Sequence, residues 1–382
     1  MKEIAYVLIN PYTIRKSRLG GVIARYLSRT DLRLVSARMF GPSMELAKGY
    51  AECVLDREAP EGEEKINQLI ADYVMKEYAP NKPTGRPHRC MLLLFEGEDA
   101  IKKIWECTGS VTLRWGCGQT VRETFGDYIT DENGNVTYFE PAVLVGPTKE
   151  FVHRTLRLIA DHIATDSGLI NTHNQERTLV MLKPDNFQRP SLRAGNIIDL
   201  LSSSGLRIVA IKKFSMTVAQ AEEFYGPVVD SLTEKFPLFG AGRVAKAVSA
   251  ELGFPVPEEA AKSLCEQIAP TFAQTQFEDI VEFMTAYRPS VVPEKEKHLR
   301  AGAECLGLIY EGENAVSKIR DILGATDPNK ARPGSVRREF GTNIMVNAAH
   351  ASDSPENAKR EMKIIDILGD NMSPFIRKYC YE

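Results

Sequence analysis

Residues 178–185 read TLVMLKPD, an apolar run with branched residues that ends in a lysine and a proline. Residues 5–12 read AYVLINPY and have the same form. Short apolar runs ended by a proline predict buried strands, because proline cannot continue a strand interior. The stretches that follow, 20–40 and 194–214, both pass from helical spacing of apolar residues into strand-like runs. A strand, a helix and a second strand are therefore predicted twice.

Two further matches follow in the same order. Residues 91–104, MLLLFEGEDAIKKI, parallel residues 306–319, LGLIYEGENAVSKI, and TVRETFG at 120–126 parallels SVRREFG at 335–341. Four ordered matches indicate an internal repeat. We therefore predict an α+β fold made of two ferredoxin-like (βαββαβ) domains in tandem.

The two copies are predicted to cover residues 1–168 and 169–382, because the stretch around DSGLINTHNQ is polar and contains a glycine. Both copies carry additional residues before the EGE strand. In the second copy these residues are numerous, about 227–302, and mostly helical in pattern, as in AAKSLCEQIA. They are predicted to form a helical insertion.

The bulk composition is that of an ordinary soluble globular protein of 382 residues, with 43% hydrophobic residues and a formal net charge of −3. This charge gives no overall attraction to nucleic acid or to a membrane. The seven cysteines form no CxxC pair, which argues against a disulfide framework or a zinc site. No apolar run approaches the ~20 residues that span a bilayer, and the N-terminus lacks a signal peptide's apolar core. We interpret the protein as cytoplasmic.

Several polar side chains of the second copy suit the binding of a phosphorylated ligand. Lys183 ends an apolar strand, and Arg320 and Arg337 carry the planar group that matches phosphate oxygens. Each of these cations, taken alone, is equally compatible with a solvated surface position. Thr326 adds a hydroxyl in a turn, and Tyr225 is either a ligand contact or a packed aromatic residue.

His350, in NAAHASDSPENAKRE at 347–361, is the candidate nucleophile. A neutral imidazole nitrogen is nucleophilic near pH 7, but attack on phosphorus requires cations around the phosphoryl oxygens and a group that orients the ring. Ser354 and Pro355 read as the N-cap and first residue of a helix, and Glu361 lies two turns along it, within reach of the ring. The alternative is a histidine that only packs near the helix start.

At these residues the second copy resembles the nucleoside diphosphate kinase family, over 176–226 and 303–366 and more loosely over 277–292. The motifs that carry the resemblance are ERTLVMLKPD, SGLRIVAIKKF, YEGENAVSKIRDILGATDP, PGSVRREFG and NAAHASDSPENAKRE. The resemblance implies transfer of a terminal phosphoryl group between nucleoside di- and triphosphates, in a ping-pong reaction through phospho-His350. It also implies Mg²⁺ that arrives with a nucleotide such as ATP, and assembly into homo-oligomers.

The family's roles are carried over where residues match. Glu361 would hydrogen-bond the His350 ring, Ser352 would support Glu361, and Asp353 would reach the magnesium through water. The phosphates and ribose would be surrounded by Lys183, Tyr225, Arg320, Thr326, Arg337 and Asn347. Phe277, with Ile280 as the other candidate, would stack on the base. The sequence departs from the family at Asn186 and Ala351, which stand at glycine positions, and at the insertion.

The first copy departs further from the family pattern. Asn10 replaces the lysine, Trp105 replaces the helix arginine, and Val143 falls near the histidine position, so that only Arg122 persists. We therefore predict a non-catalytic first domain and an active second one. The other hypotheses are a nucleotide-binding regulatory protein with little kinase activity, and a scaffold in which both domains serve assembly only.

Overall fold

The computed structural model describes residues 2–58, 64–112, 118–170 and 173–381. Its chain divides into two compact units. The larger unit contains residues 1–214 and 305–382, and the smaller unit contains residues 215–304. The described chain combines helices with a large antiparallel sheet, so the predicted α+β class is confirmed. In the described ranges, no helix combines the length and apolarity needed to cross a bilayer.

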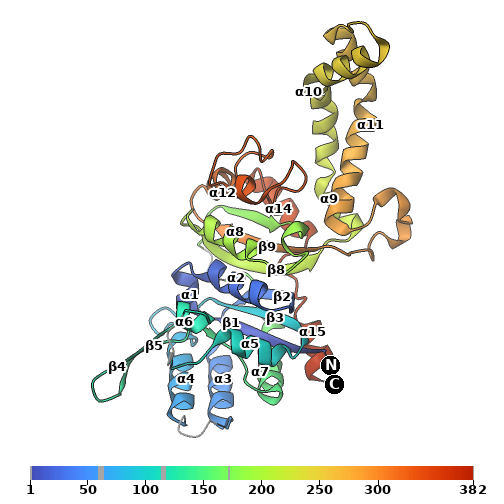
Figure 1. Cartoon of the computed structure of the whole chain (residues 1–382). Helices are drawn as coiled ribbons and strands as arrows, with labels where there is room; N and C mark the ends of the chain where they lie inside the picture. Colours follow the sequence, from blue (N-terminus) through green and yellow to red (C-terminus); the bar gives the residue numbers. More distant parts are fainter. Residues whose placement is uncertain (1, 59–63, 113–117, 171–172, 382) are drawn as a thin grey trace. The chain divides into compact units, whose positions relative to one another are not determined.

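The larger unit is built on a single eight-stranded sheet, in the order β10-β7-β9-β8-β2-β3-β1-β6 (Figure 1). Each half of the chain contributes four neighbouring strands, and β2 meets β8 in the middle, where Arg38 lies opposite Lys212. The strands are β1 (Lys2–Ile9), β2 (Arg33–Phe40), β3 (Cys90–Glu98), β6 (Val143–Leu144), β7 (Arg177–Leu182), β8 (Arg207–Ser215), β9 (Glu304–Glu311) and β10 (Ala349–Ala351). From the outer edge inward, the two halves follow the same order of strands.

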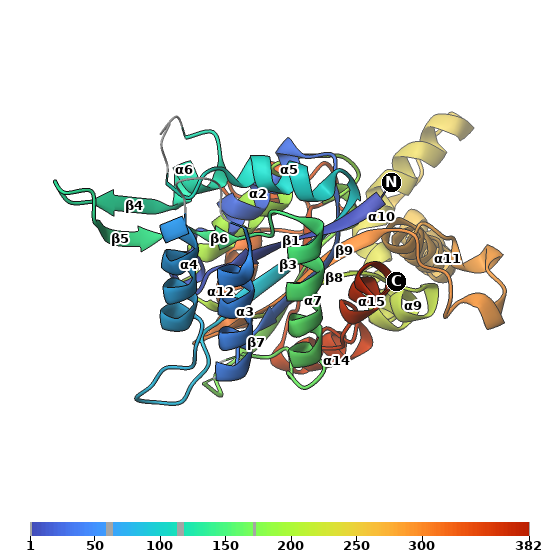
Figure 2. The ribbon, with the colours of Figure 1, turned by 90° about the horizontal axis from the view of Figure 1, so that it is seen from below.

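The strands are buried on both faces because helices cover both. In β1, Ile4 to Ile9 are all buried, which explains why the sequence shows a continuous apolar run rather than alternation. In the N-terminal half, α3, α4 and α7 lie side by side on one face (Figure 2). The helices of this half are α1 (Pro11–Arg15), α2 (Leu19–Arg29), α3 (Met44–Asp56), α4 (Glu64–Glu77), α5 (Ala100–Thr108), α6 (Val121–Phe125) and α7 (Lys149–Ile163).

A separate hairpin of β4 (Asp127–Thr130) and β5 (Val136–Glu140) also belongs to the N-terminal half. The sequence interpretation missed it, because the ENGN turn at 132–135 lies between short runs that are only partly buried and show no apolar run. The C-terminal half has no such hairpin among its described strands. Its helices are α8 (Arg193–Ser202), α12 (Ala315–Leu323), α13 (Val336–Phe340), α14 (Pro355–Ile364) and α15 (Ser373–Cys380), with the 3₁₀ turn η1 (Pro184–Asn186).

The two halves also meet through α2 and α8, which pack closely. The contact depends on glycine: a Cβ on Gly20 would lie 2.4 Å from the carbonyl oxygen of Gly195, and a Cβ on Gly195 would lie 2.2 Å from that of Gly20. Any side chain at either position would force the helices apart. The backbone N–H of Gly21 donates to Asp199 Oδ1 across the same contact, at 3.1 Å.

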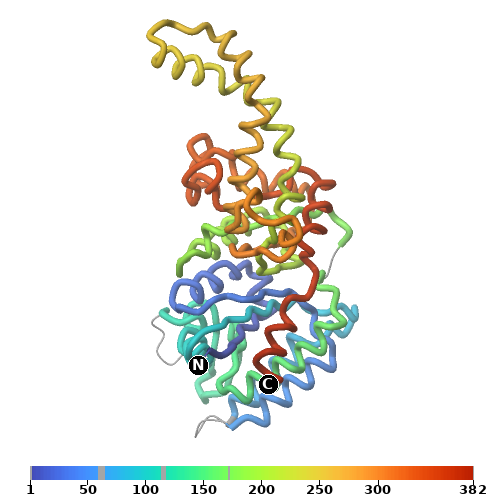
Figure 3. Tube along the Cα trace, turned by 90° about the vertical axis from the view of Figure 1, so that its right-hand side faces the viewer, coloured from blue at the N-terminus to red at the C-terminus, as the bar shows by residue number. Residues whose placement is uncertain are grey.

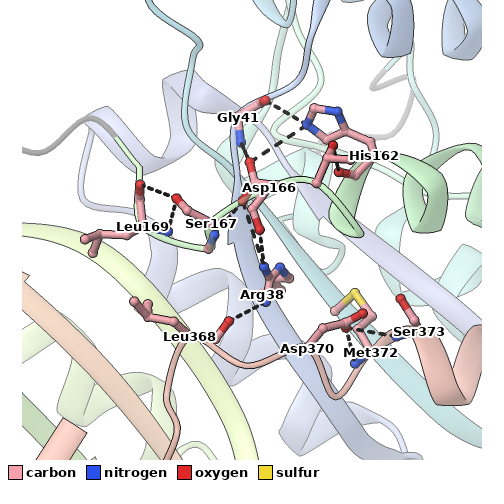
Figure 4. A network of polar contacts seen from close by, with 12 residues as sticks. Arg38, Gly41, His162, Asp166, Ser167, Leu169, Leu368, Asp370, Met372 and Ser373 are labelled. Carbon is pink, nitrogen blue, oxygen red and sulfur yellow. Dashed lines mark hydrogen bonds and ion pairs between the residues drawn. The ribbon is translucent and has the colours of Figure 1, made fainter. Parts of the chain in front are cut away.

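Buried Arg38 ties the segment between the halves to the C-terminal tail (Figure 4). Its guanidinium donates to the carbonyl oxygens of Asp166, at 2.8 Å, and Leu368, at 3.1 Å. The Asp166 carboxylate accepts from Gly41 N, and the Gly41 carbonyl contacts His162 Nε2 at 2.9 Å. The tail then places α15 beside α7 of the N-terminal half (Figure 3).

The smaller unit is helical. Its long helices α10 (Pro227–Leu252) and α11 (Glu258–Thr285) pack against each other as a hairpin (Figure 1). The Phe236 and Phe272 rings stack at 4.0 Å between centroids, over Cys265 and Ala269. The unit also contains α9 (Val218–Tyr225) and the 3₁₀ turns η2 (Pro289–Val291) and η3 (Glu294–Glu296). The predicted insertion is thus mainly two helices.

Candidate active site

His350 is the middle residue of β10, which pairs antiparallel with β7, so that His350 lies opposite Met181. Just before it, the Ala348 carbonyl accepts from the backbone N–H of Lys183 at 3.0 Å and from Asn186 Nδ2 at 2.8 Å. Ala348 itself adopts a left-handed conformation, with φ of 70°. These contacts hold the loop that carries His350 against the end of the strand that carries Lys183.

Asn186 and Ala351, which stand at the family's glycine positions, both have negative φ, so neither position requires glycine in this chain.

Glu361 orients the histidine ring. Its Oε2 lies 3.0 Å from His350 Nε2 and accepts a hydrogen bond from Ser352 Oγ at 2.6 Å. Glu361 lies on α14, whose first turn is set by Pro355 at N1 and by Ser354, whose hydroxyl accepts from Asn357 N. The predicted cap is confirmed. Because Glu361 and Ser352 are both buried, this hydrogen-bonded chain is fixed by packing before any ligand arrives.

Lys183 extends from the end of β7 and donates from Nζ to the Met345 carbonyl at 3.0 Å. The pKa of Lys183 is lowered to about 8, mainly by burial and also by nearby Arg337, whereas Asp185 acts in the opposite direction. The Asp185 carboxylate also forms an ion pair with Arg193 at 2.9 Å, so it compensates the charge of Lys183 only in part. Lys183 is therefore a buried cation with a second cation, Arg337, close by.

Arg337 is held by two backbone carbonyls. Its Nη1 donates to Gly324 at 3.0 Å, and its Nη2 donates to Ala349, the neighbour of His350, at 3.2 Å. The pKa of Arg337 is lowered to about 10, mainly by burial and also by nearby Arg320. Each guanidinium group makes the positive charge of the other less favourable, so an anion bound between them would stabilise both charges. Arg320 on α12 and Arg337 on α13 thus lie close together and line one cavity.

A cavity of about 390 Å³ opens beside these arginines. Thr326 and Ala351 also line it, whereas His350 and Lys183 do not, so the cavity lies next to the histidine rather than over it. Asn347 is buried behind the loop and donates from Nδ2 to the Thr326 carbonyl at 3.1 Å. Its Oδ1 has no hydrogen-bond partner in the described structure.

The sequence interpretation missed Arg332, which also lines this cavity and pairs with Asp321 at 2.9 Å. Its sequence position could have indicated this, because Arg332 lies in ARPGSVR, five residues before Arg337. Its guanidinium adds a third arginine to the lining. The electrostatic character of the cavity is therefore cationic, although one carboxylate lies within it.

Three of the predicted nucleotide contacts, those of Tyr225, Phe277 and Asp353, stay predictions. Tyr225 ends α9 and packs on Phe224, with ring centroids 4.8 Å apart, and Phe277 is buried within α11. Both residues belong to the smaller unit, and their part in the site stays a prediction. Asp353 is exposed at the start of α14, where its Oδ1 accepts from Asn357 Nδ2 at 2.7 Å.

Comparison with known proteins gives one consistent result. The family model described as nucleoside diphosphate kinase matches residues 176–236 and 273–365, which leaves out the outer part of the α10–α11 hairpin and the N-terminal half. The nucleoside diphosphate kinase of Campylobacter hominis is 33% identical over 187 residues, covering 49% of this chain and 92% of that protein. That of Campylobacter jejuni is 34% identical over 188 residues, covering 49% and 93%.

Two solved structures are also similar to part of the chain. The Aquifex aeolicus nucleoside diphosphate kinase is 28% identical, covers 50% of this chain and 94% of that chain, and has a TM-score of 0.31. An NDP kinase from Pyrobaculum aerophilum is 25% identical, with the same coverages and a TM-score of 0.36.

Proposed function

The chain belongs to the nucleoside diphosphate kinase family through its C-terminal half, and from this membership we propose that His350 transfers a phosphoryl group between nucleotides. The observation that carries the proposal is the buried chain Ser352–Glu361–His350 beside a cationic cavity. A histidine held by a carboxylate, next to arginines that are themselves fixed by backbone carbonyls, is the arrangement that nucleophilic attack on phosphorus requires.

In the first half-reaction, His350 attacks the terminal phosphorus of a nucleoside triphosphate. A carboxylate can only accept hydrogen bonds, so Glu361 favours the tautomer with the proton on Nε2 and the lone pair on Nδ1. The Nδ1–P bond forms as the bond to the bridging oxygen breaks, and the nucleoside diphosphate leaves. The ring gains positive charge in this step, and Glu361 stabilises that charge.

The cations act on the charge that the phosphoryl oxygens carry during transfer. Arg337 is positioned next to His350 through its bond to Ala349, and Arg320, on α12, lines the same cavity as Arg337. Lys183 supplies a further positive charge from β7. The lining suits phosphate oxygens rather than a metal ion, so Mg²⁺ would enter with the nucleotide and neutralise part of its charge. In the second half-reaction a nucleoside diphosphate takes the phosphoryl group and restores His350.

The N-terminal half is proposed to be a degenerate copy that does not catalyse. Tandem ferredoxin-like copies that share one sheet would account for the matching strand order in the two halves. In that case the first copy occupies the place of a second subunit within the same chain. Assembly of whole chains into a homo-oligomer stays a prediction.

The proposal is tested by incubating the full chain with Mg²⁺ and ATP labelled at the terminal phosphate, with no acceptor present. We expect an acid-labile label on the protein that GDP removes as GTP. His350→Ala should carry no label, whereas the control His298→Ala, which changes an exposed histidine of the smaller unit, should label like the wild type. A folded wild-type protein that binds nucleotide but stays unlabelled would contradict transfer and favour a regulatory nucleotide-binding protein.

A further inference from the structure

A second cavity, of about 160 Å³, lies where the two halves of the larger unit meet. We call it the seam cavity. The α2–α8 contact provides part of its wall, through Gly20 and Ile198. Its polar lining comes from both halves: Arg15, Ser17 and Arg89 from the N-terminal half, and Ser202, Arg207 and Tyr310 from the C-terminal half.

The lining of the seam cavity is positively charged. It contains three arginines and no aspartate or glutamate among the described residues. The carboxylates that approach these arginines lie outside the lining: Arg207 donates to Glu311 at 2.9 Å, and Arg15 is 3.6 Å from Glu77. Positive charge therefore faces the cavity from both sides.

Arg89 is the least compensated of the three arginines. It donates from Nη1 to the Ile208 carbonyl at 2.8 Å, and the described residues offer it no carboxylate within 4 Å. Burial lowers the pKa of Arg89, and Arg207 and Arg15 lower it further. Burial also lowers the pKa of the adjacent His88, and Arg15 adds to that effect. These groups are close enough to repel one another, and a bound anion would relieve that repulsion.

Tyr310 provides an independent indication of a ligand. It is only 1% exposed and lines the seam cavity, yet its hydroxyl has no hydrogen-bond partner in the described structure. A buried hydroxyl without a partner costs about 1–3 kcal/mol. Packing does not require this hydroxyl, because the matching residue in the FEGE strand of the N-terminal half is Phe95.

We propose that the seam cavity binds a tetrahedral oxyanion of the phosphate class through Arg15, Arg89 and Arg207, with the Tyr310 hydroxyl as an additional donor. The cavity volume supports an anion of this size, since 160 Å³ is below the roughly 300–1,000 Å³ of sites for larger organic ligands. The ligand is therefore free inorganic phosphate or the terminal phosphate of a molecule that extends into solvent. Because the cations come from both halves, the bound anion stabilises their junction.

The test must separate this site from the phosphate-binding residues around His350. Arg320→Gln serves as the background, because it removes a cation of the active-site cavity and lies outside the seam cavity. The midpoint of thermal unfolding and calorimetric binding are measured with inorganic phosphate, against chloride at equal ionic strength. We expect phosphate to bind and to raise the midpoint in this background.

Adding Arg89→Gln should weaken phosphate binding on the order of tenfold or more, because a charged donor to the anion is lost. The matched control is Arg33→Gln. Arg33 occupies the position in the N-terminal half that corresponds to Arg207, and it pairs with Glu96. This control should leave phosphate binding unchanged. Equal phosphate binding in the Arg89 and Arg33 variants, or none in the Arg320→Gln background, would overturn the proposal.

Tyr310→Phe provides a second variant that keeps the packing. Without phosphate it should unfold at the same temperature as the parent or higher, because the unpaired hydroxyl is gone. With phosphate it should show weaker binding and a smaller rise of the midpoint. Unchanged binding would remove Tyr310 from the site and contradict its proposed role. Binding of pyrophosphate and AMP then distinguishes the two sources of the anion. If they bind more tightly than inorganic phosphate, the natural ligand is the terminal phosphate of a larger molecule. If they bind more weakly, the natural ligand is free inorganic phosphate.

Discussion

The two halves of the chain hold their outer strands in the same way but differ in the side chains placed there. In the C-terminal half the Lys183 N–H donates to the Ala348 carbonyl at 3.0 Å, and in the N-terminal half the Asn10 N–H donates to the Ala142 carbonyl at 3.1 Å. Both alanines are left-handed, with φ of 70° and 61°. The backbone of the site therefore exists in both halves.

One arginine also has the same structural role in both halves. Arg122 donates to the carbonyls of Gly109 and Val143, as Arg337 donates to those of Gly324 and Ala349. In both arginines Nε is buried without a hydrogen-bond partner in the described structure. Retention of Arg122 is thus explained by its support of the loop, and it is no sign of catalysis.

Apart from this arginine, the side chains proposed to act in the transfer are present in one half only. The strand register places Leu144, and not Val143 as predicted, at the position of His350. Thr155 stands at the position of Glu361 on the equivalent helix, and Asn10 stands at that of Lys183. The N-terminal half therefore forms the same loop without a histidine. Packing of the loop does not require His350, which points to a functional role for this residue.

The cavities at the matching places differ in charge as well. The N-terminal half has one of about 1040 Å³ beside Trp105, Gly109 and Val111, and its described lining residues include four carboxylates and two arginines. One of those arginines, Arg154, is paired with Asp56 at 2.8 Å. Asn10 is tied into a buried network, since it donates to Glu140 at 2.9 Å. This surrounding does not favour the phosphates of a nucleotide.

The largest effect is expected for the nucleophile. His350→Ala should reduce ATP-to-GDP transfer by at least about 10⁴-fold, because no other group can form the covalent intermediate. The reciprocal change, Leu144→His, should not restore transfer in the His350→Ala chain, since the orienting carboxylate and the helix arginine are absent there. Steady-state assays of both variants provide the measurement. Recovered transfer in the double variant would break the distinction between the halves.

The junction between the halves should contribute strongly to stability. Arg38→Met would leave the carbonyls of Asp166 and Leu368 without their donor and should lower the free energy of unfolding by about 2–4 kcal/mol. Lys48→Met, which also replaces a cation with methionine but on the exposed side of α3, should stay within about 0.5 kcal/mol of the wild type. Urea unfolding of the two variants tests this, and equal stabilities would show that the Arg38 network does not hold the junction.

The orienting carboxylate should have a smaller effect. Glu361→Gln should lower kcat by roughly 10- to 100-fold, as expected for loss of a charged hydrogen bond of about 1.5–3 kcal/mol. Thr155→Val, the equivalent position in the N-terminal half, should leave kcat unchanged. Single-turnover phosphorylation rates measure the step directly. A similar loss in both variants would mean that Glu361 acts through stability rather than through the histidine.

The pH dependence gives the smallest effect. The pKa of Lys183 is lowered to about 8, so above that pH the free enzyme loses the charge that attracts phosphates, and kcat/KM should fall up to tenfold per pH unit. The free energy of unfolding changes in the opposite direction. Below pH 8 the folded protein carries the cost of burying the charged Lys183 side chain. As the pH rises from 8 toward 10.5 this cost disappears, and the free energy of unfolding increases. Lys183→Arg, which stays charged, should remove the fall in kcat/KM. A fall that persists in this variant would assign the titration to another group.

The sequence predicted the repeated strands and the elements around His350 because both depend on local patterns. The apolar runs of β1 and β7, the Ser354 cap and the helix that carries Glu361 are examples. It could not predict that β2 and β8 join into one sheet, because strand pairing between the halves depends on long-range contacts such as Gly20 against Gly195. It also missed Arg332, whose place in the cavity depends on the fold of a loop. The one-residue error at Val143 arose because no motif marks the register of β6.

The most direct test of the central claim is the number and position of phosphoryl groups that one chain accepts. Intact-mass measurement after brief incubation with MgATP, followed by peptide mapping under alkaline conditions, should give one phosphoryl group per chain, on the peptide that contains His350. GDP should remove it completely. A second phosphoryl group on the N-terminal half, or a single group on a peptide without His350, would contradict the account.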